Sequence, residues 1–158
     1  MALKSVLAGL LLLVVYPVSA LHAFEPVRSP AQKVEAMVRA AADLVKAKGE
    51  AVFPEFRKKG SKWLGREHYI FIFDEKGPEL VNGGFPKMEG KNRWDHKDTS
   101  GLYVIREEVA LVKAKGSGWI DVLWPRPGQT RAVKSRSFLQ GVTVGDRLLI
   151  VGAPLYLE

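Results

Sequence analysis

The sequence predicts an α+β domain in which helices pack on one side of a five-stranded antiparallel sheet. Helical segments are marked by capping residues, by apolar residues at three- and four-residue steps, and by glycines at their ends. Five short segments are rich in β-branched and aromatic residues, and most are joined by connections of hairpin length, which favours antiparallel pairing. The chain has 158 residues. Since roughly 100 to 200 residues form one domain, we expect a single domain over residues 29–158.

The first twenty residues have the composition of a cleaved signal peptide. Lys4 precedes an almost pure Leu, Val and Ala run over residues 6–16, and Pro17 and small residues up to Ala20 follow it. About 11 apolar residues fall short of the roughly 20 that a membrane-spanning helix needs, which argues against a retained membrane anchor. We therefore expect cleavage after Ala20 or after Ala23, and a periplasmic or secreted protein.

The composition excludes several classes of protein. The chain has no cysteine, so it has no disulfide, no thiolate metal site and no cysteine nucleophile. It has neither a GxSxG motif nor a phosphate-binding glycine loop. Its 24 Lys and Arg against 17 Asp and Glu give a net charge of +7, but the expected export argues against nucleic acid as the partner of the basic stretch 57–66. We expect no catalytic residue, no cofactor and no enzyme activity.

Two polar clusters contain residue types that can carry chemistry. Asp95, His96 and Asp98 resemble metal ligands, but a solvated turn is the simpler interpretation. Glu107 and Glu108 are neighbours on a predicted helix, where adjacent side chains point about 100° apart and cannot share a proton. We expect both glutamates on a solvated helix face, and we expect no metal site.

The first elements of the mature domain are a long helix, a short helix and two strands. Ser29 and Pro30 predict the start of the long helix, and Gly49 predicts its end. A short helix is expected over residues 51–59, with Phe53 and Phe56 inward and Gly60 as its stop. A strand over 68–74 is apolar on both faces, so we place it near the middle of the sheet, with a returning strand over 79–81. On the first strand, Tyr69, Phe71 and Phe73 share one face, and Ile70 and Ile72 share the other.

A long loop separates these elements from the rest of the domain. Residues 82–101 are rich in glycine, proline and polar residues, which predicts irregular structure with at most a helical turn. Loops of this length are often functional. Asp98, Thr99 and Ser100 offer capping groups for a helix over 102–115. Three strands are expected after it, over residues 119–124, 134–142 and 147–156.

An aromatic and cationic set on the strands is the best candidate for a binding site. Aromatic side chains wall many ligand pockets, and Lys and Arg bind anions. The alternative is that the aromatics belong to the core and the cations to the surface. The aromatic members are Tyr69, Phe71, Trp119 and Trp124, and the cations are Arg126, Lys134 and Arg136.

Several short sequence motifs follow one another along the chain, and together they cover nearly all of the mature protein. They are GEAVFPEFRKKGSKW at 49–63, EGKN at 89–92, GSGW at 116–119 and WPRPG at 124–128, with the segments 68–74, 101–115, 145–146 and 151–157. This order resembles a bacterial single Cache domain of the small-ligand-sensing type. The resemblance implies a PAS-like fold, with a long N-terminal helix along a curved sheet and a pocket between sheet and loops. It also implies an extracytoplasmic sensor that holds a small carboxylate ligand between Lys or Arg and aromatic rings.

Three departures from the family pattern affect the expected pocket. The segment 82–84, Asn-Gly-Gly, replaces a histidine–proline pair, and Phe138 and Val122 stand where the family usually has tyrosines. We keep Phe138 as a ligand-binding candidate. The alternative is a protein-interaction module without ligand, whose vestigial pocket is filled by Phe138 and Val122. Since the chain ends after its last predicted strand, we expect signalling by contact with a membrane-bound kinase, chemoreceptor or transporter.

Overall fold

The first element of the structure is a long helix at the predicted position. The computed structural model describes residues 28–157, so the predicted signal peptide lies outside the described residues. Helix α1, Pro30–Lys48, begins with a capping box in which the Gln32 backbone N–H donates to Ser29 and the Ser29 N–H donates to the Gln32 side chain. Gly49, with a φ of 60°, ends the helix. Between residues 28 and 157, no helix combines the length and apolarity that membrane crossing requires.

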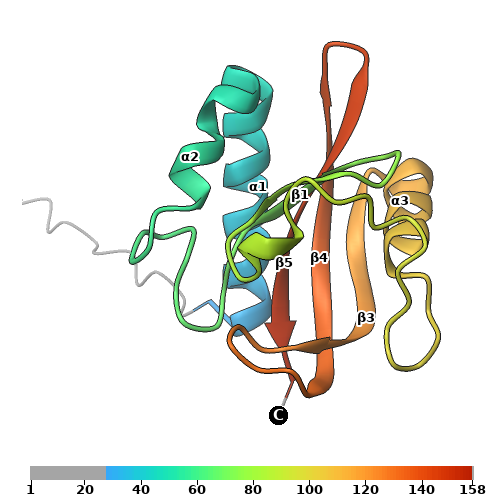
Figure 1. The fold of residues 1–158 in the computed structure, drawn as a ribbon. Helices are drawn as coiled ribbons and strands as arrows, with labels where there is room; N and C mark the ends of the chain where they lie inside the picture. The colour runs from blue at the N-terminus through green and yellow to red at the C-terminus, as the bar shows by residue number, and fades with distance from the viewer. Residues whose placement is uncertain (1–27, 158) are drawn as a thin grey trace, which may run out of the picture.

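Five strands form one antiparallel sheet in the order β2-β1-β5-β4-β3 (Figure 1). Each strand agrees with a predicted one to within a few residues. Strand β1 lies between β2 and β5, which confirms its interior position in the sheet. The strands are β1 Phe71–Asp74, β2 Glu79–Asn82, β3 Ser117–Pro125, β4 Ala132–Val144 and β5 Arg147–Tyr156.

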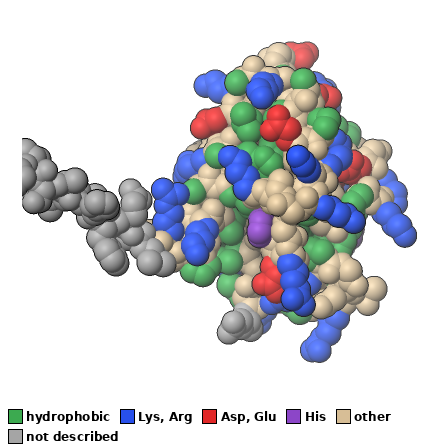
Figure 2. All heavy atoms as spheres, turned by 90° about the vertical axis from the view of Figure 1, so that its left-hand side faces the viewer, with side chains coloured by type: hydrophobic (Ala, Val, Ile, Leu, Met, Phe, Trp, Pro, Cys, Tyr) green, Lys and Arg blue, Asp and Glu red, His purple; other side chains and the backbone are tan. Residues whose placement is uncertain are grey.

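The segment after α1 contains less helix than predicted. A 3-10 turn η1, Gly49–Val52, leads into the short helix α2, Phe53–Phe56, whose two phenylalanines are buried as expected. The basic residues that follow, Arg57, Lys58, Lys59, Lys62 and Arg66, are all exposed. Figure 2 shows Lys and Arg side chains spread over the face that carries α1 and α2. These cations therefore belong to the solvated surface.

The helices lie on both faces of the sheet, so the expectation that they share one side is wrong. Helices α1 and α2 cover one face and pack with Ile70 and Ile72. Helix α3, Val104–Lys115, covers the opposite face and packs with Phe71 and Phe73 (Figure 1). Since successive residues of a strand point to opposite faces, a strand covered on both sides is apolar throughout.

The loop between β2 and α3 is tied to the sheet by Asp98. This residue does not cap α3, which begins after Tyr103 without a side-chain cap. Instead one carboxylate oxygen of Asp98 accepts from the backbone N–H groups of Ser100, at 2.8 Å, and Leu102, at 3.1 Å. The other oxygen accepts from the N–H of Leu123 in β3, at 3.0 Å. Apart from the 3-10 turn η2, Pro86–Met88, the loop is irregular, and Asp98 holds its end beside the sheet.

Candidate functional site

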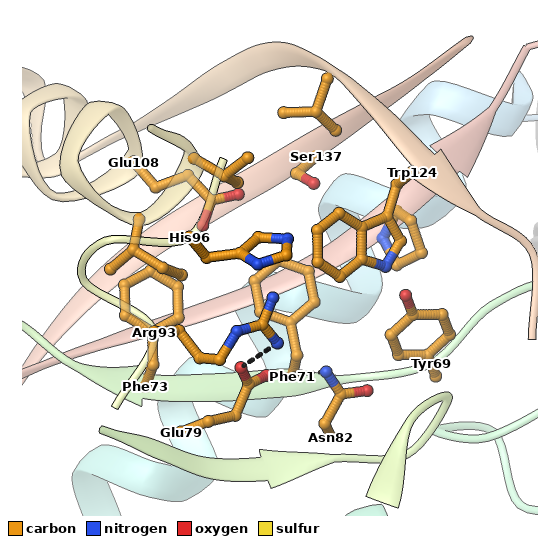
Figure 3. A pocket seen from close by; sticks show the side chains of 14 residues that line it. Tyr69, Phe71, Phe73, Glu79, Asn82, Arg93, His96, Glu108, Trp124 and Ser137 are labelled. Atoms are coloured by element: carbon orange, nitrogen blue, oxygen red, sulfur yellow. Dashed lines mark hydrogen bonds and ion pairs between the residues drawn. The ribbon is translucent and has the colours of Figure 1, made fainter. Parts of the chain in front are cut away.

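A small cavity lies between the α3-bearing face of the sheet and the loop over residues 83–103 (Figure 3). Its interior volume is about 30 Å³, which is room for about two water-sized groups. The structure therefore contains a pocket where the resemblance to Cache domains implies one. The cavity is lined by Tyr69, Phe71, Phe73, Glu79, Asn82, Arg93, His96, Val104, Ile105, Glu108, Val122, Trp124, Ser137 and Pro154.

One wall of the cavity is aromatic. Every second residue along β1 and the segment just before it is aromatic: Tyr69, Phe71 and Phe73. Because residues two apart in a strand point to the same face, all three side chains face the cavity. The rings of Phe71 and Phe73 are stacked, with centroids 6.2 Å apart. Trp124 of β3 reaches the same cavity from the far edge of the sheet (Figure 3). These rings provide an apolar surface for a short carbon chain.

A buried cation and a buried carboxylate face each other in the cavity. Arg93, from the loop, is 8% exposed, and Glu79, from β2, is 4% exposed. Arg93 Nη1 lies 3.7 Å from Glu79 Oε2, beyond hydrogen-bond distance. Glu79 Oε1 accepts a hydrogen bond of 2.7 Å from the Asn82 side chain. Burial raises the pKa of the Glu79 carboxyl, against the effects of Asn82 and Arg93.

The guanidinium of Arg93 is held in place by its neighbours while several of its N–H groups lack an acceptor. Its carbon Cζ lies 5.4 Å from the centroid of the Trp124 ring, which is a cation–π contact. Burial lowers the pKa of Arg93, and the charges of Glu79 and Glu108 oppose this shift, but a guanidinium stays charged in proteins. Its Nη1 donates to Sδ of Met88, and among residues 28–157 no oxygen accepts a hydrogen bond from the Arg93 side chain. The arrangement can therefore offer several N–H donors to an anion.

Glu108 lies in the opposite wall, which corrects the expectation of a solvated helix face. It is 2% exposed, whereas its neighbour Glu107 is exposed, as predicted. Glu108 comes from α3 and lines the cavity (Figure 3). Burial raises the pKa of its carboxyl well above the ordinary value, and the charge of Glu79 adds to this effect. The helix thus presents one glutamate to solvent and the next to the cavity.

His96 completes the polar lining from the loop. Its ring packs against Trp124 with centroids 5.4 Å apart. Burial and the positive charge of Arg93 lower the pKa of His96, so a neutral imidazole faces the cavity at neutral pH. Its neighbour Asp95 pairs with Arg106 outside the cavity. Within the described part of the chain, no group of three His, Asp or Glu side chains is arranged to hold a metal ion.

Tyr69, which lines the cavity, is connected through Tyr156 to Arg126 outside it. The hydroxyl oxygens of Tyr69 and Tyr156 lie 3.4 Å apart, and Tyr156 donates to the carbonyl oxygen of Pro125 at 2.8 Å. Burial raises the pKa of the Tyr69 hydroxyl well above its ordinary value. Arg126 stacks on the Tyr156 ring at 4.8 Å and pairs with Glu67 at 3.0 Å. Arg126 therefore packs on Tyr156 and does not line the cavity.

Seven of the eight candidate residues from the sequence divide between the two faces of the sheet, and the eighth, Arg126, lies in the connection between β3 and β4. Tyr69, Phe71 and Trp124 line the cavity. In β4, residue 137 faces the cavity, so Lys134, Arg136 and Phe138 alternate onto the α1-bearing face. Trp119 lies on that face too, because its ring packs on Phe138 at 5.3 Å and its Nε1 donates to Glu35 at 2.8 Å.

The structure also separates the three candidate cations. Arg136 pairs with Asp121 at 2.7 Å and stacks on Trp119 at 5.2 Å, and Lys134 is exposed. The cation that lines the cavity is Arg93, which sequence reasoning missed because it stands alone in an irregular loop. Of the two residues expected to fill a vestigial pocket, Val122 lines the cavity and Phe138 points away from it.

The fold resembles solved sensor domains. A periplasmic sensor domain of a chemotaxis protein is 28% identical, with a TM-score of 0.66 over 80% of this chain and 94% of that one. A Cache chemosensory domain whose structure concerns carboxylic acid recognition is also 28% identical, with a TM-score of 0.63 over 78% of this chain and 86% of that one. Both comparisons confirm the long helix on an antiparallel sheet.

Curated relatives are much longer proteins with a matching segment. The methyl-accepting chemotaxis protein McpP of Pseudomonas putida is 28% identical over 71 residues, or 44% of this chain and 13% of the relative. The sensor histidine kinase MctS of Rhizobium johnstonii is 30% identical over 94 residues, or 60% of this chain and 20% of the relative. A family model described as a Cache domain matches residues 55–149, which is more than half of the sequence. The chain therefore belongs to the Cache domain family.

Proposed function

We propose that this chain is an extracytoplasmic sensor domain, and not an enzyme, whose cavity binds a small organic acid. The observation that carries the proposal is the buried guanidinium of Arg93, which lines the cavity and, apart from the contact of Nη1 with Met88 Sδ, has N–H donors without an acceptor among residues 28–157. A carboxylate can accept two parallel hydrogen bonds from such a group. The related Cache domain with a structure of carboxylic acid recognition supports this ligand class.

The cavity limits the size of the acid. The carboxylate would meet Arg93, and the carbon chain would lie against Phe71, Phe73 and Trp124. An interior of about 30 Å³ is tight even for acetate, so among short acids such as acetate, propionate, pyruvate or lactate the larger ones require the lining side chains or the loop to move outward. The contacts proposed for Tyr69, Phe71 and Trp124 are those expected from the sequence, with Arg93 in the role expected of Arg126, Lys134 or Arg136.

The proposal includes how the bound state is passed on. The curated relatives are a chemotaxis protein and a sensor kinase, so we propose contact with a membrane-bound kinase, chemoreceptor or transporter. Ligand occupancy would change the loop over residues 83–103, which contributes Arg93 and His96 and is fastened to β3 through Asp98. The domain would act in the periplasm or outside the cell after cleavage of residues 1–20.

A thermal-shift screen of short organic acids tests the proposal. A ligand that binds only the folded chain at ten times its Kd adds about 1.4 kcal/mol, which raises the Tm by several degrees. Arg93→Lys should weaken binding at least tenfold because an ammonium lacks the planar pair of donors. Arg136→Lys, on the opposite face, is the matched control and should bind as the parent does. If no acid raises the Tm at millimolar concentration, the interaction module without ligand is the better description.

A further inference from the structure

Glu108 is a buried carboxyl group that the proposed function does not use. It is 2% exposed and lines the cavity, yet it makes no hydrogen bond or ion pair with any residue between 28 and 157. Every fully buried side-chain oxygen or nitrogen among these residues has a partner. The oxygens of Glu108 must therefore border the cavity space (Figure 3). An unpartnered polar group in this position is available to a ligand.

The charges that face Glu108 decide which form it takes. Glu79 of β2 is acidic, Arg93 of the loop is basic, and His96 and Tyr69 are neutral at pH 7. The strands packed against α3 contribute the side chains of Val122, Trp124 and Ser137, none of which titrates. If both glutamates were ionised, the cavity would carry one net negative charge before any ligand entered. A carboxylate ligand would then add a second negative charge in a space of low dielectric constant.

We propose that Glu108 contacts the ligand and donates a hydrogen bond from its carboxylic acid O–H to the bound carboxylate. This inference rests on the proposed binding of an organic acid. Arg93 would hold one side of the ligand carboxylate and Glu108 the other, so that two carboxyl groups share one proton, as in other close carboxyl pairs. Hydrogen bonds of this O–H···O⁻ type are short and strong. Burial raises the pKa of Glu108 well above its ordinary value, which is the direction that favours the protonated form.

The arrangement links ligand affinity to pH. Only the protonated form of Glu108 can donate, so affinity should fall as the pH rises through the pKa of this group, by up to about tenfold per pH unit. A ligand with an amino group would behave in the opposite way, because an ionised Glu108 would pair with its ammonium. The direction of the pH dependence therefore distinguishes the two ligand classes.

Calorimetric titration of the purified chain with propionate, from mildly acidic to mildly alkaline pH, tests the inference. The parent chain should lose affinity with rising pH. Glu108→Gln keeps an N–H donor of similar shape and should bind within a few-fold of the parent at acidic pH, with a shallower pH dependence, because only Glu79 and His96 still titrate in the cavity. Glu108→Ala should bind at least tenfold more weakly, and Glu107→Gln, at the neighbouring exposed position, should match the parent.

Two outcomes overturn this inference while leaving the proposed function intact: Glu108→Gln keeps the pH profile of the parent, or affinity rises with pH. If the parent binds none of the short acids at any pH, the proposed function fails and the role of Glu108 fails with it.

Infrared spectroscopy provides a readout without ligand. At neutral pH, the parent and Glu107→Gln should both show a carboxylic acid C=O band, and this band should be weaker in Glu108→Gln. Bands of equal intensity in all three proteins would overturn the inference.

Discussion

The Arg93 guanidinium lies 3.7 Å from the Glu79 carboxylate, and both side chains are buried in the wall of the cavity. At this distance the groups attract each other without a hydrogen bond, so Glu79 balances the charge of Arg93 and takes up none of its N–H donors, one of which contacts Met88 Sδ. A carboxylate ligand would compete with Glu79 for the same cation. The ion pair that stabilises the cavity wall therefore also weakens the binding of an acid.

Replacement of Glu79 by Gln should separate these two effects. The variant keeps an oxygen that accepts from Asn82 but leaves Arg93 without its buried partner, so the free energy of unfolding should fall by about 3 kcal/mol. Propionate should bind several-fold more tightly because no carboxylate competes for Arg93. Urea denaturation measures the free energy of unfolding, and calorimetry measures the affinity for propionate.

Glu67→Gln, in an exposed pair with Arg126, is the control and should change the free energy of unfolding by less than about 1 kcal/mol. Weaker binding by Glu79→Gln would contradict the competition between Glu79 and ligand.

The stability of the ligand-free chain should depend on pH through the buried glutamates. Burial raises the pKa of Glu79 and Glu108 in the folded chain, so the folded state holds protons that the unfolded state has released. Their contribution is fully present below the unfolded pKa and is lost as the pH rises through the folded pKa. Relative to the parent, Glu108→Gln should therefore gain stability as the pH rises above about 4.3. Urea denaturation at a series of pH values measures this difference. A difference that is constant with pH would show that Glu108 keeps an ordinary pKa.

The elements of the fold were predictable because their signals are local. The capping residues Ser29 and Gln32 and the terminal Gly49 are contiguous with the helix that they define. Alternation along residues 69–73 separated the two faces of β1 correctly. The side on which each helix packs was not predictable in this way. It depends on how distant segments cross the sheet, and an apolar strand such as β1 fits helices on one face or on both.

The cavity residues were harder to predict because their roles come from tertiary burial. Glu107 and Glu108 are the same residue type at adjacent positions, and only the packing of α3 makes one of them buried. Arg93 lies in an irregular loop without periodicity, so no pattern indicated that it faces inward. In β4, neighbouring residues point to opposite faces of the sheet, so either Phe138 or Ser137 can line the cavity. An aromatic side chain is the more typical lining residue, but the structure places Ser137 in the cavity and Phe138 on the opposite face.

Gly84 is expected to be intolerant of even a methyl group, because the ring of Tyr69 lies against its backbone. A Cβ atom at this position would lie 2.5 Å from Cε1 of Tyr69, and Tyr69 is fully buried with little freedom to move. Gly84→Ala should lower the free energy of unfolding by roughly 1 to 3 kcal/mol and weaken acid binding by displacing the tyrosine from the cavity. Gly83→Ala, whose Cβ would lie 3.2 Å from a terminal methyl of Leu64 and 3.3 Å from the Cβ of Tyr69 but away from its ring, should cost less. Equal losses in the two variants would rule out a specific role for the contact with Tyr69.

Asp98 should control both the stability of the domain and the position of the loop that carries Arg93 and His96. Although burial opposes ionisation, hydrogen bonds from Ser100 and from the backbone N–H groups of Leu123 and Leu102 hold the pKa of Asp98 below its ordinary value. Its contribution is therefore present above the unfolded pKa and is lost as the pH falls through the folded pKa.

Asp98→Ala would leave several N–H groups without an acceptor, so we expect a loss of about 2 to 4 kcal/mol in urea denaturation. Backbone amide hydrogen exchange should increase at Leu102 and Leu123, and propionate binding should weaken because Arg93 is no longer held over the aromatic wall. Asp95→Ala removes only an exposed partner of Arg106 and should cost less than about 1 kcal/mol. If Asp98→Ala loses stability but binds propionate as the parent does, the loop end fastened by Asp98 does not position Arg93.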